Sequence, residues 1–271
     1  MAFNKSKRLE GINVLVAEDV ELNRMVLNDM LTMEGAHITF GNDGLQTLNL
    51  LKENNKDTFD IVLMDIQMPV MDGYEATQEM LKLYPDLLII GLSAHALSEV
   101  KSRCFAVGMV DHISKPVSID NLVTTIKRHN PTITTLPESP VNLQTTEVKD
   151  TIYTHETPPE SNTIIDWPAL HKRYNRRDNI IKTLATTFVS SYKETPADIR
   201  RAIHAKDSVA LSLIAHGMKG SAGYLEAHQL HQLATLTEAQ VKQNNTNTYI
   251  TSEKLAIAIE QLTEALREIT D

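Results

Sequence analysis

A single cysteine, Cys104, occurs in the 271 residues, so an internal disulfide is excluded and a reducing compartment is favoured. The chain also lacks an apolar run of about 18 residues, the length that a membrane-spanning helix needs. No signal-peptide pattern precedes the first apolar segment. Dense Lys/Arg runs are missing from a chain of formal charge −9, which argues against nucleic-acid binding. These absences predict a cytoplasmic protein with no membrane span and no nucleic-acid partner.

Two further absences limit the chemistry. The sequence contains no glycine-rich ATP-binding motif and no recognisable pair of DNA-binding helices. We therefore expect the chain to contain neither a kinase source of phosphoryl groups nor a transcriptional output. The length and the 42% hydrophobic content suit one large domain or two ordinary ones.

Residues 1–130 alternate short apolar runs with segments of helical period, the pattern of a doubly wound α/β domain. Strands are predicted at residues 12–17, 36–40, 61–64, 87–92 and 109–114. Helices are predicted at residues 22–33, 45–51, 74–84, 98–107 and 119–129, the first with apolar residues at Leu22, Val26, Met30 and Met33. We expect a flavodoxin-like, five-stranded parallel sheet with strand order 2-1-3-4-5 and right-handed crossovers.

Polar side chains follow four of these strands, at the point where each strand ends. Glu18 and Asp19 follow the first strand, Asp65 the third, Ser93 the fourth and Lys115 the fifth. In the predicted order, these carboxyl ends meet at one edge of the sheet, where open α/β sheets hold their ligands. Each residue alone is more often a surface or capping residue, but their combination at corresponding strand ends favours a functional site.

The charges at this edge indicate its chemistry. Three crowded carboxylates repel one another unless a cation lies among them, and oxygen ligands suit Mg²⁺. A carboxylate beside Mg²⁺ can attack a phosphoryl group and carry it as an acyl phosphate. Lys115 and the metal would balance charge on the transferring oxygens, and Ser93 would donate a hydrogen bond to them.

Residues 11–130 resemble the response-regulator receiver domains of two-component signalling. The resemblance rests on the acidic pair Glu18-Asp19, on Asp65 within Met-Asp-Ile-Gln-Met-Pro, on Ser93 and on Lys115-Pro116. It implies that Asp65 accepts a phosphoryl group and that the Lys115-Pro116 peptide bond is cis.

The same resemblance implies a metal site and a switch residue. Asp19, Asp65 and the backbone carbonyl of Gln67 would bind Mg²⁺ directly, and Glu18 would bind it through water. The switch position on the fifth strand is usually Tyr or Phe, but here it is His112, which departs from the family's aromatic coupling to Ser93.

Residues 131–163 differ in composition from the rest. They contain five of the ten prolines and many threonines, and they show no helical or strand period. Such a segment is typical of a flexible linker. It would hold two domains at a mutual concentration of roughly 1 mM, or it would be a mere spacer.

Residues 164–271 are helical in pattern throughout. Apolar faces occur at Ile181, Leu184 and Phe188, on a helix through Leu230 and Leu233, and along a last helix from Leu255 to Ile269. No strand is predicted between them. We expect an all-α domain folded as an antiparallel four-helix bundle.

The helix predicted at residues 207–225 carries a histidine away from its apolar side. At 100° per residue, His216 lies nearly opposite the stripe that contains Leu211 and Met218. Lys219 and the glycines at 220 and 223 share the face of His216. Each glycine inside a helix costs roughly 1 kcal/mol against alanine, which favours close approach by another domain. A solvated histidine on a polar face is the alternative.

Residues 166–270 resemble histidine phosphotransfer (HPt) domains through the run His216-Gly-Met-Lys219-Gly220-Ser221-Ala. The resemblance implies that His216 accepts a phosphoryl group on Nε2, that Lys219 helps to hold it, and that Gly220 leaves room for a receiver. A rival site is His228-x-x-His231, whose spacing is compatible with zinc, although no cysteine or other convergent ligand lies near it in sequence.

The preferred interpretation is a phosphorelay protein in which phosphoryl groups pass between histidine and aspartate. A histidine kinase would supply Asp65, Asp65 and His216 would exchange the group, and a downstream response regulator would be the other partner of His216. The receiver would catalyse its own transfer, so the chain is not expected to be an enzyme in the usual sense. One alternative is the C-terminal part of a hybrid sensor histidine kinase. A phosphatase that uses Asp65 is less favoured because Gln67 stands where that chemistry wants a second aspartate, and a binding scaffold leaves the converging strand ends unexplained.

Overall fold

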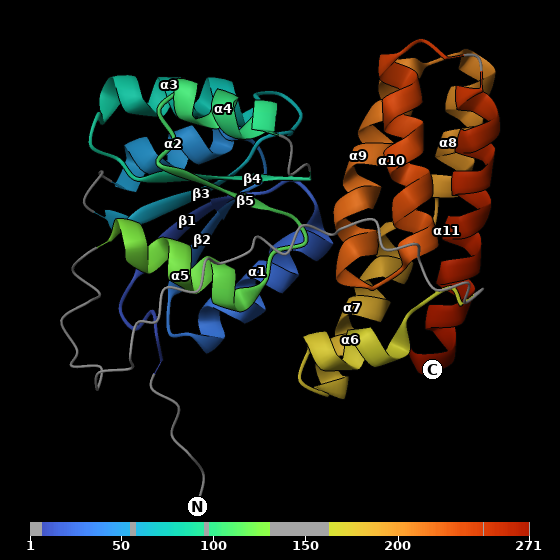
Figure 1. Ribbon diagram of the computed structural model, residues 1–271, viewed down its shortest axis with the longest axis horizontal. Coiled ribbons are helices and arrows are strands. Elements are labelled where there is room, and N and C mark those ends of the chain that lie inside the picture. Colours follow the sequence, from blue (N-terminus) through green and yellow to red (C-terminus); the bar gives the residue numbers. More distant parts are fainter. Residues whose placement is uncertain (1–6, 55–57, 95–97, 131–162, 246, 271) are drawn as a thin grey trace, which may run out of the picture.

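The computed structural model describes residues 7–54, 58–94, 98–130, 163–245 and 247–270. It contains an N-terminal α/β part, here called the sheet domain (residues 7–130), and a C-terminal helical part, here called the helix bundle (residues 163–270) (Figure 1). The predicted linker at residues 131–163 lies outside the described residues, apart from Thr163.

A five-stranded parallel sheet forms the centre of the sheet domain. Its order is β2-β1-β3-β4-β5, which confirms the predicted order. The strands are β1 (Asn13–Ala17), β2 (His37–Gly41), β3 (Ile61–Asp65), β4 (Ile89–Ser93) and β5 (Asp111–Ser114). Every residue of β3 and β4 is buried, as expected for strands covered on both faces.

Five helices cover the two faces of this sheet, and all five were predicted. They are α1 (Glu21–Met33), α2 (Gly44–Asn54), α3 (Gly73–Leu83), α4 (Ser98–Ala106) and α5 (Ile119–His129). Leu27 of α1 and Ile126 of α5 share one hydrophobic cluster with the sheet. Leu48, Met80 and Cys104 place α2, α3 and α4 in the cluster on the other face. Cys104 is thus a packing residue in a helix.

The turn after β3 fixes the end of the central strand. Asp72 accepts a hydrogen bond from the backbone N–H of Glu75 and so caps α3. Gly73 packs directly on the strand, because a Cβ atom there would lie 2.1 Å from the carbonyl oxygen of Asp65. This contact requires glycine, and it holds the end of β3 tightly against the start of α3.

The described residues of the helix bundle form helices with no strand between them, as the sequence predicted. Its helices are α6 (Trp167–Arg173), α7 (Asp178–Ser191), α8 (Thr195–Ala205), α9 (Ser208–Tyr224), α10 (His228–Lys242) and α11 (Thr248–Thr270). Helices α6 and α8 were not predicted individually, and both begin beside a proline, at Pro168 and Pro196. None of the helices in the described residues is long and apolar enough to cross a bilayer.

Helix α1 packs on both domains through two different stripes. Leu27 and Leu31 belong to the cluster beneath the sheet. Leu22, Val26 and Met30, spaced four residues apart, belong instead to the hydrophobic cluster of the helix bundle. The predicted helical stripe was therefore correctly spaced, but it covers the second domain and not the sheet, and Met33 at its end is 46% exposed. Figure 1 shows α1 between the sheet and the bundle.

Candidate functional site

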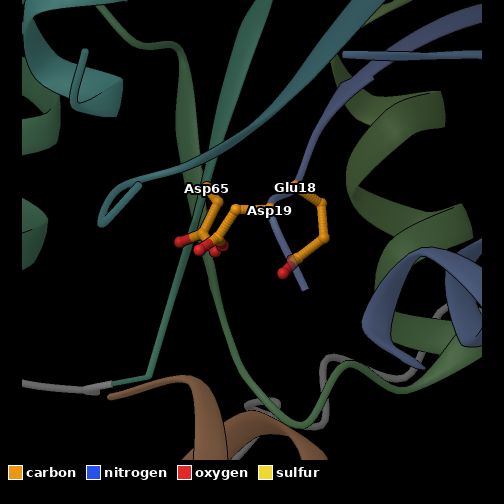
Figure 2. Close-up of side chains that lie close together, drawn as sticks. All are labelled: Glu18, Asp19 and Asp65. Atoms are coloured by element: carbon orange, nitrogen blue, oxygen red, sulfur yellow. The ribbon is translucent and has the colours of Figure 1, made fainter. Parts of the chain in front are cut away.

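Three carboxylates meet at the carboxyl edge of the sheet. Glu18 and Asp19 follow β1, Asp65 ends β3, and these two strands are paired side by side. One carboxylate oxygen from each of the three lies within 4.8 Å of the others, and Figure 2 shows the three side chains converging. Adjacency of β1 and β3, which the strand order predicted, is what brings them together.

Lys115 links two of these carboxylates. Its Nζ atom lies 2.5 Å from Oε2 of Glu18 and 2.5 Å from Oδ2 of Asp65. Burial alone lowers the pKa of Lys115, but attraction to Asp65 and Glu18 outweighs burial and raises the pKa, so the ammonium stays charged. The peptide bond from Lys115 to Pro116 is cis, as predicted.

Burial and the negative charge of Asp65 both act on the acidic pair Glu18 and Asp19. Burial raises the pKa of Glu18 to about 7, against the attraction of Lys115. The amide of Asn23 donates a hydrogen bond of 2.8 Å to Oε1 of Glu18. Burial and the charge of Asp65 also raise the pKa of Asp19. The Oδ1 atom of Asp19 is buried and has no hydrogen-bond partner, so the cluster contains an unsatisfied oxygen ligand.

Asp65 is held by the chain that follows it. The backbone N–H of Gln67 donates to Oδ1 of Asp65 at 3.1 Å, while Oδ2 accepts from Lys115. The side chain of Asp65 is 2% exposed. Both oxygens of this carboxylate are therefore oriented by fixed donors.

Ser93 ends β4 and contacts the neighbouring strand. Its Oγ atom lies 2.7 Å from Nε2 of His112 on β5, and the residue is buried. Burial and the charge of Lys101 lower the pKa of His112, so the ring is neutral at neutral pH. His112, at the predicted switch position, thus contacts Ser93 through a hydrogen bond, which the sequence alone did not indicate.

His216 lies on α9 at the boundary between the helix bundle and the sheet domain. The sequence placed it opposite the apolar stripe of its helix, on a face that favours close approach by another domain, with a solvated histidine as the alternative. Its side chain is 11% exposed, because α10 and the sheet domain cover that face. Its Nδ1 atom is buried, has no hydrogen-bond partner, and lies 3.8 Å from Oε1 of Glu238 on α10. That separation is longer than a hydrogen bond but close enough for strong electrostatic attraction.

Lys219 is not on an open face, contrary to the helical projection. Its side chain is 1% exposed, and its Nζ atom donates to Oε2 of Glu238 at 2.7 Å. Lys242 donates to the other oxygen of Glu238, also at 2.7 Å. Burial raises the pKa of Glu238, but the His216 ring and Lys219 outweigh it and lower the pKa. Burial and the charge of Lys242 lower the pKa of Lys219, against the attraction of Glu238.

Three glycines of α9 lie against the sheet domain. A Cβ atom at Gly220 would lie 2.8 Å from the amide nitrogen of Asn23, and one at Gly223 would lie 3.3 Å from Pro116. A Cβ atom at Gly217 would make only an ordinary contact with Val20 at 3.4 Å. The loops that carry the acidic pair and Lys115 therefore approach the backbone of the helix that carries His216.

Polar contacts continue this boundary, which we call the docking face: Gly217, Gly220, Gly223 and Tyr224 of α9, with Arg177 and Ser191 at the ends of α7. The hydroxyl of Tyr224 accepts from the backbone N–H of Val117 at 3.4 Å. Arg177 donates to both carboxylate oxygens of Asp29 at 3.3 and 3.0 Å, and Ser191 donates to Glu21 at 3.1 Å.

Sequence reasoning missed several of these residues. Asn23 and Glu238 are polar residues on the buried sides of amphipathic helices, at 2% and 1% exposure. A polar side chain within an apolar stripe was the available signal, because such a group must find a partner when it is buried. Tyr224, fully buried at the end of α9, carried no such signal.

The rival histidine pair does not form a metal cluster. His228 lies 3.8 Å from Asp166 and from Glu226, and burial lowers the pKa of His231. Within the ranges that the structure describes, only Glu18, Asp19 and Asp65 form a group of three or more potential metal-ligating side chains.

Comparison with known families divides the chain in the same way. Residues 14–127 match the family described as the response regulator receiver domain. Residues 183–269 match the family described as the Hpt domain. The two matches contain the acidic cluster and His216, respectively.

Among curated proteins, the sensor histidine kinase RcsC of Escherichia coli strain K12 is 42% identical over 117 residues, as is RcsC of Salmonella typhimurium. The peroxide stress-activated histidine kinase mak1 of Schizosaccharomyces pombe is 35% identical over 127 residues. These alignments cover 43% of this chain and 12% of each RcsC protein, and 45% of this chain and 8% of mak1. The chain thus matches only a small part of each relative.

Solved structures also resemble the sheet domain. The receiver domain of sensor histidine kinase PA1611 from Pseudomonas aeruginosa PAO1 is 32% identical, with a TM-score of 0.41 and coverage of 45% of this chain and 98% of that one. The co-crystal structure of the Saccharomyces cerevisiae proteins Ypd1 and Ssk1 matches with 24% identity, a TM-score of 0.42 and coverage of 45% and 91%.

Proposed function

Because this chain joins a response regulator receiver domain to an Hpt domain and so has a role in two-component phosphorelay, we propose that Asp65 and His216 exchange a phosphoryl group within it. Asp65 is the acceptor on the receiver side and Nε2 of His216 the acceptor on the bundle side. Glu18, Asp19, Ser93 and Lys115 assist at the first site.

One contact carries this proposal. Asn23 donates to Glu18 in the acidic cluster, and the same side-chain amide lies against Gly220, one turn from His216 on α9. The charge of His216 also acts on Asp19, whose pKa it lowers against the larger effect of burial. The two acceptor sites therefore belong to one local environment, which a mere spacer between independent domains would not produce.

The acidic cluster suits Mg²⁺. Its donor atoms are oxygens, and the Oδ1 atom of Asp19, which is buried without a hydrogen-bond partner, is available to coordinate a cation. Asp19, Asp65 and the backbone carbonyl of Gln67 would hold the ion, with Glu18 beside it. When bound, Mg²⁺ offsets negative charge on the transferring phosphoryl oxygens.

The transfer needs few groups from the chain itself. An oxygen of Asp65 forms a bond to phosphorus while the bond from phosphorus to Nε2 of His216 breaks, and the electron pair remains on Nε2. Lys115 already lies beside Asp65, and its ammonium stabilises the negative charge on the phosphoryl oxygens during transfer. Ser93 donates to a phosphoryl oxygen after leaving His112. The reverse transfer uses the same groups in the opposite order.

The bundle contributes an acceptor that is held in place. Glu238 attracts the Nδ1 side of the imidazole, which leaves the Nε2 lone pair for phosphorus. Lys219 pairs with Glu238, and in this proposal its ammonium helps to hold a phosphoryl group on His216. Catalysis is therefore expected from the receiver domain, and positioning from the bundle.

A histidine kinase supplies the phosphoryl group, and a response regulator receives it from His216. The relatives named as sensor histidine kinases favour such a kinase as the source, on this polypeptide or on another. A hybrid sensor kinase that ends in these two domains is the second candidate, because the chain corresponds to only 12% of the RcsC relatives.

Single-turnover labelling of the full chain tests the proposal. Acetyl phosphate with Mg²⁺ should label Asp65 first, as alkali-labile acyl phosphate, and then His216, as acid-labile phosphoramidate. The transfer rate constant should not change over a hundredfold dilution, since the two groups share one chain. Asp65→Asn should abolish both labels, and His216→Gln only the second.

A mixture of the two variants supplies the control. Label placed on the Asp65 of a His216→Gln chain should reach the His216 of an Asp65→Asn chain only in proportion to protein concentration. Transfer in the mixture at low micromolar protein that matches the intact chain would refute exchange within one chain. Absence of label on His216 under all conditions would refute the relay itself.

A further inference from the structure

The docking face of the helix bundle is already occupied by the chain's own receiver domain. The His216 side chain retains 11% exposure. Gly220 and Gly223 approach Asn23 and Pro116 so closely that a single added Cβ atom would lie within 3.4 Å of them. No layer of solvent or second protein fits between surfaces at that separation. A receiver domain from another molecule can therefore reach His216 only after the chain's own receiver has left.

The contact is extensive and well matched in chemistry. Leu22 and Val26 of α1 are at most 1% exposed, within the hydrophobic cluster of the bundle. The Arg177–Asp29 ion pair lies at its rim, where the two side chains are 30% and 28% exposed. Burial of the apolar stripe supplies the stability, and the rim ion pair fixes the register of the two surfaces.

The covalent connection favours this state over competitors. If a linker of the predicted flexible type gives a mutual concentration of roughly 1 mM, an external receiver at about 1 μM and of equal affinity is outcompeted about a thousandfold. An external receiver at that concentration would need an affinity about a thousandfold higher to occupy the docking face equally often.

We propose that the chain's own receiver domain acts as a gate on His216, so that phosphotransfer to any other receiver requires the two domains to separate. This inference rests on the proposed relay, and it adds that exchange within the chain and transfer between chains use the same surface and exclude each other. The expected partner in the open state is another receiver domain that presents an acidic residue to Arg177.

A charge exchange at the Arg177–Asp29 pair tests the gate on full-length chains. The donor carries Asp65→Asn with Asp29→Arg, and phosphoramidate charges its His216 directly, with release of ammonia. The acceptor carries His216→Gln with Arg177→Asp. Within each chain the altered pair now repels, but between chains the donor's Arg177 meets the acceptor's Asp29, so the native contact forms only in trans. Label should reach the acceptor's Asp65 at least about tenfold faster than between chains with native residues 29 and 177.

Equal transfer rates in the two mixtures, whether fast or slow, would overturn the gate.

A second measurement does not depend on the relay. Diethyl pyrocarbonate should modify His216 slowly relative to the exposed His204 in the native chain, faster in Asp29→Arg, and slowly again in the double variant Asp29→Arg/Arg177→Asp, in which the pair is restored. Indifference of His216 to these changes would also refute the gate, whereas failure of label to pass from Asp65 to His216 in the intact chain would refute only the proposed function.

Discussion

The Oγ atom of Ser93 and the Nε2 atom of His112 lie 2.7 Å apart, so the hydroxyl at the end of β4 is bound to a ring on β5. A phosphoryl group on Asp65 would compete for that hydroxyl. Movement of Ser93 would then break its hydrogen bond to His112. Loss of this hydrogen bond would take the role that movement of an aromatic side chain has in the receiver domains that this domain resembles.

Acid should destabilise this pair. Burial and Lys101 lower the pKa of His112, and a base with a lowered pKa contributes stability above its unfolded value, about 6.5, that is lost as pH falls through the folded value. The free energy of unfolding of the native chain should therefore fall between pH 8 and pH 5 by more than that of His112→Gln. Chemical denaturation at the two pH values measures the difference, and parallel losses would contradict this role of His112.

Glu18 should have the opposite pH dependence. Its pKa is raised from 4.5 to about 7 by burial, so its contribution is present below pH 4.5 and is lost as pH rises through about 7. Glu18→Gln should remove this loss, and Mg²⁺ should offset it in the native chain at pH 8. Denaturation at pH 5.5 and pH 8, with and without Mg²⁺, checks both statements. The free energy of unfolding changes with pH in opposite directions for the two groups, so Glu18→Gln and His112→Gln serve as controls for each other.

Gly220→Ala should slow phosphotransfer to His216 without lowering the stability of the helix bundle. Alanine favours an exposed helix over glycine by roughly 1 kcal/mol, so the bundle itself should not be weakened. The new Cβ atom would lie 2.8 Å from the Asn23 amide, which Glu18 holds in place, so docking should suffer. We expect a transfer rate from Asp65 to His216 at least about tenfold lower, since an interface clash of this kind costs about 1–3 kcal/mol.

Gly217→Ala is the matched control for that change. It makes the same substitution one turn earlier on α9, where the added atom meets only Val20 at 3.4 Å. Its transfer rate should stay within about twofold of the native value, because the contact is of ordinary van der Waals length. Equal slowing by the two variants would point to a general effect on α9 instead of a specific contact.

Glu238→Gln should alter the imidazole of His216 as well as its reactivity. Loss of the buried charge removes the attraction that favours a proton on Nδ1, so the Nε2-protonated tautomer should become more populated, and ¹⁵N chemical shifts of the ring report this change. We expect transfer to slow roughly tenfold, the worth of about 1.5 kcal/mol of charge-assisted contact. Lys242→Met, which removes only the outer partner of Glu238, should leave the tautomer unchanged.

Most of the sheet domain follows from local sequence signals. The five strands, their order and the convergence of Glu18, Asp19, Asp65 and Lys115 could be predicted, because apolar runs mark buried strands and parallel strands end at a common edge. The hydrogen bond between Ser93 and His112 could not be predicted, since strand order brings two residues near each other without fixing which atoms meet.

The bundle shows where helical periodicity stops being informative. A helical projection of the sequence places His216 and Lys219 on the same side of α9. Whether these side chains are buried depends on which other elements pack against that side. Glu238 on α10 covers Lys219, and the sheet domain covers His216. Likewise the spacing of Leu22, Val26 and Met30 predicted a buried stripe correctly, yet periodicity carries no information about which partner buries it.

The two stripes of α1 have a practical consequence for any fragment of this protein. A polypeptide cut after residue 130 would keep Leu27 and Leu31 beneath its sheet but would turn Leu22, Val26 and Met30 toward water. Such a strip invites self-association, so the solubility and apparent mass of the fragment should depend on its concentration. Separation of the two domains within the intact chain would expose the same strip unless another surface covered it.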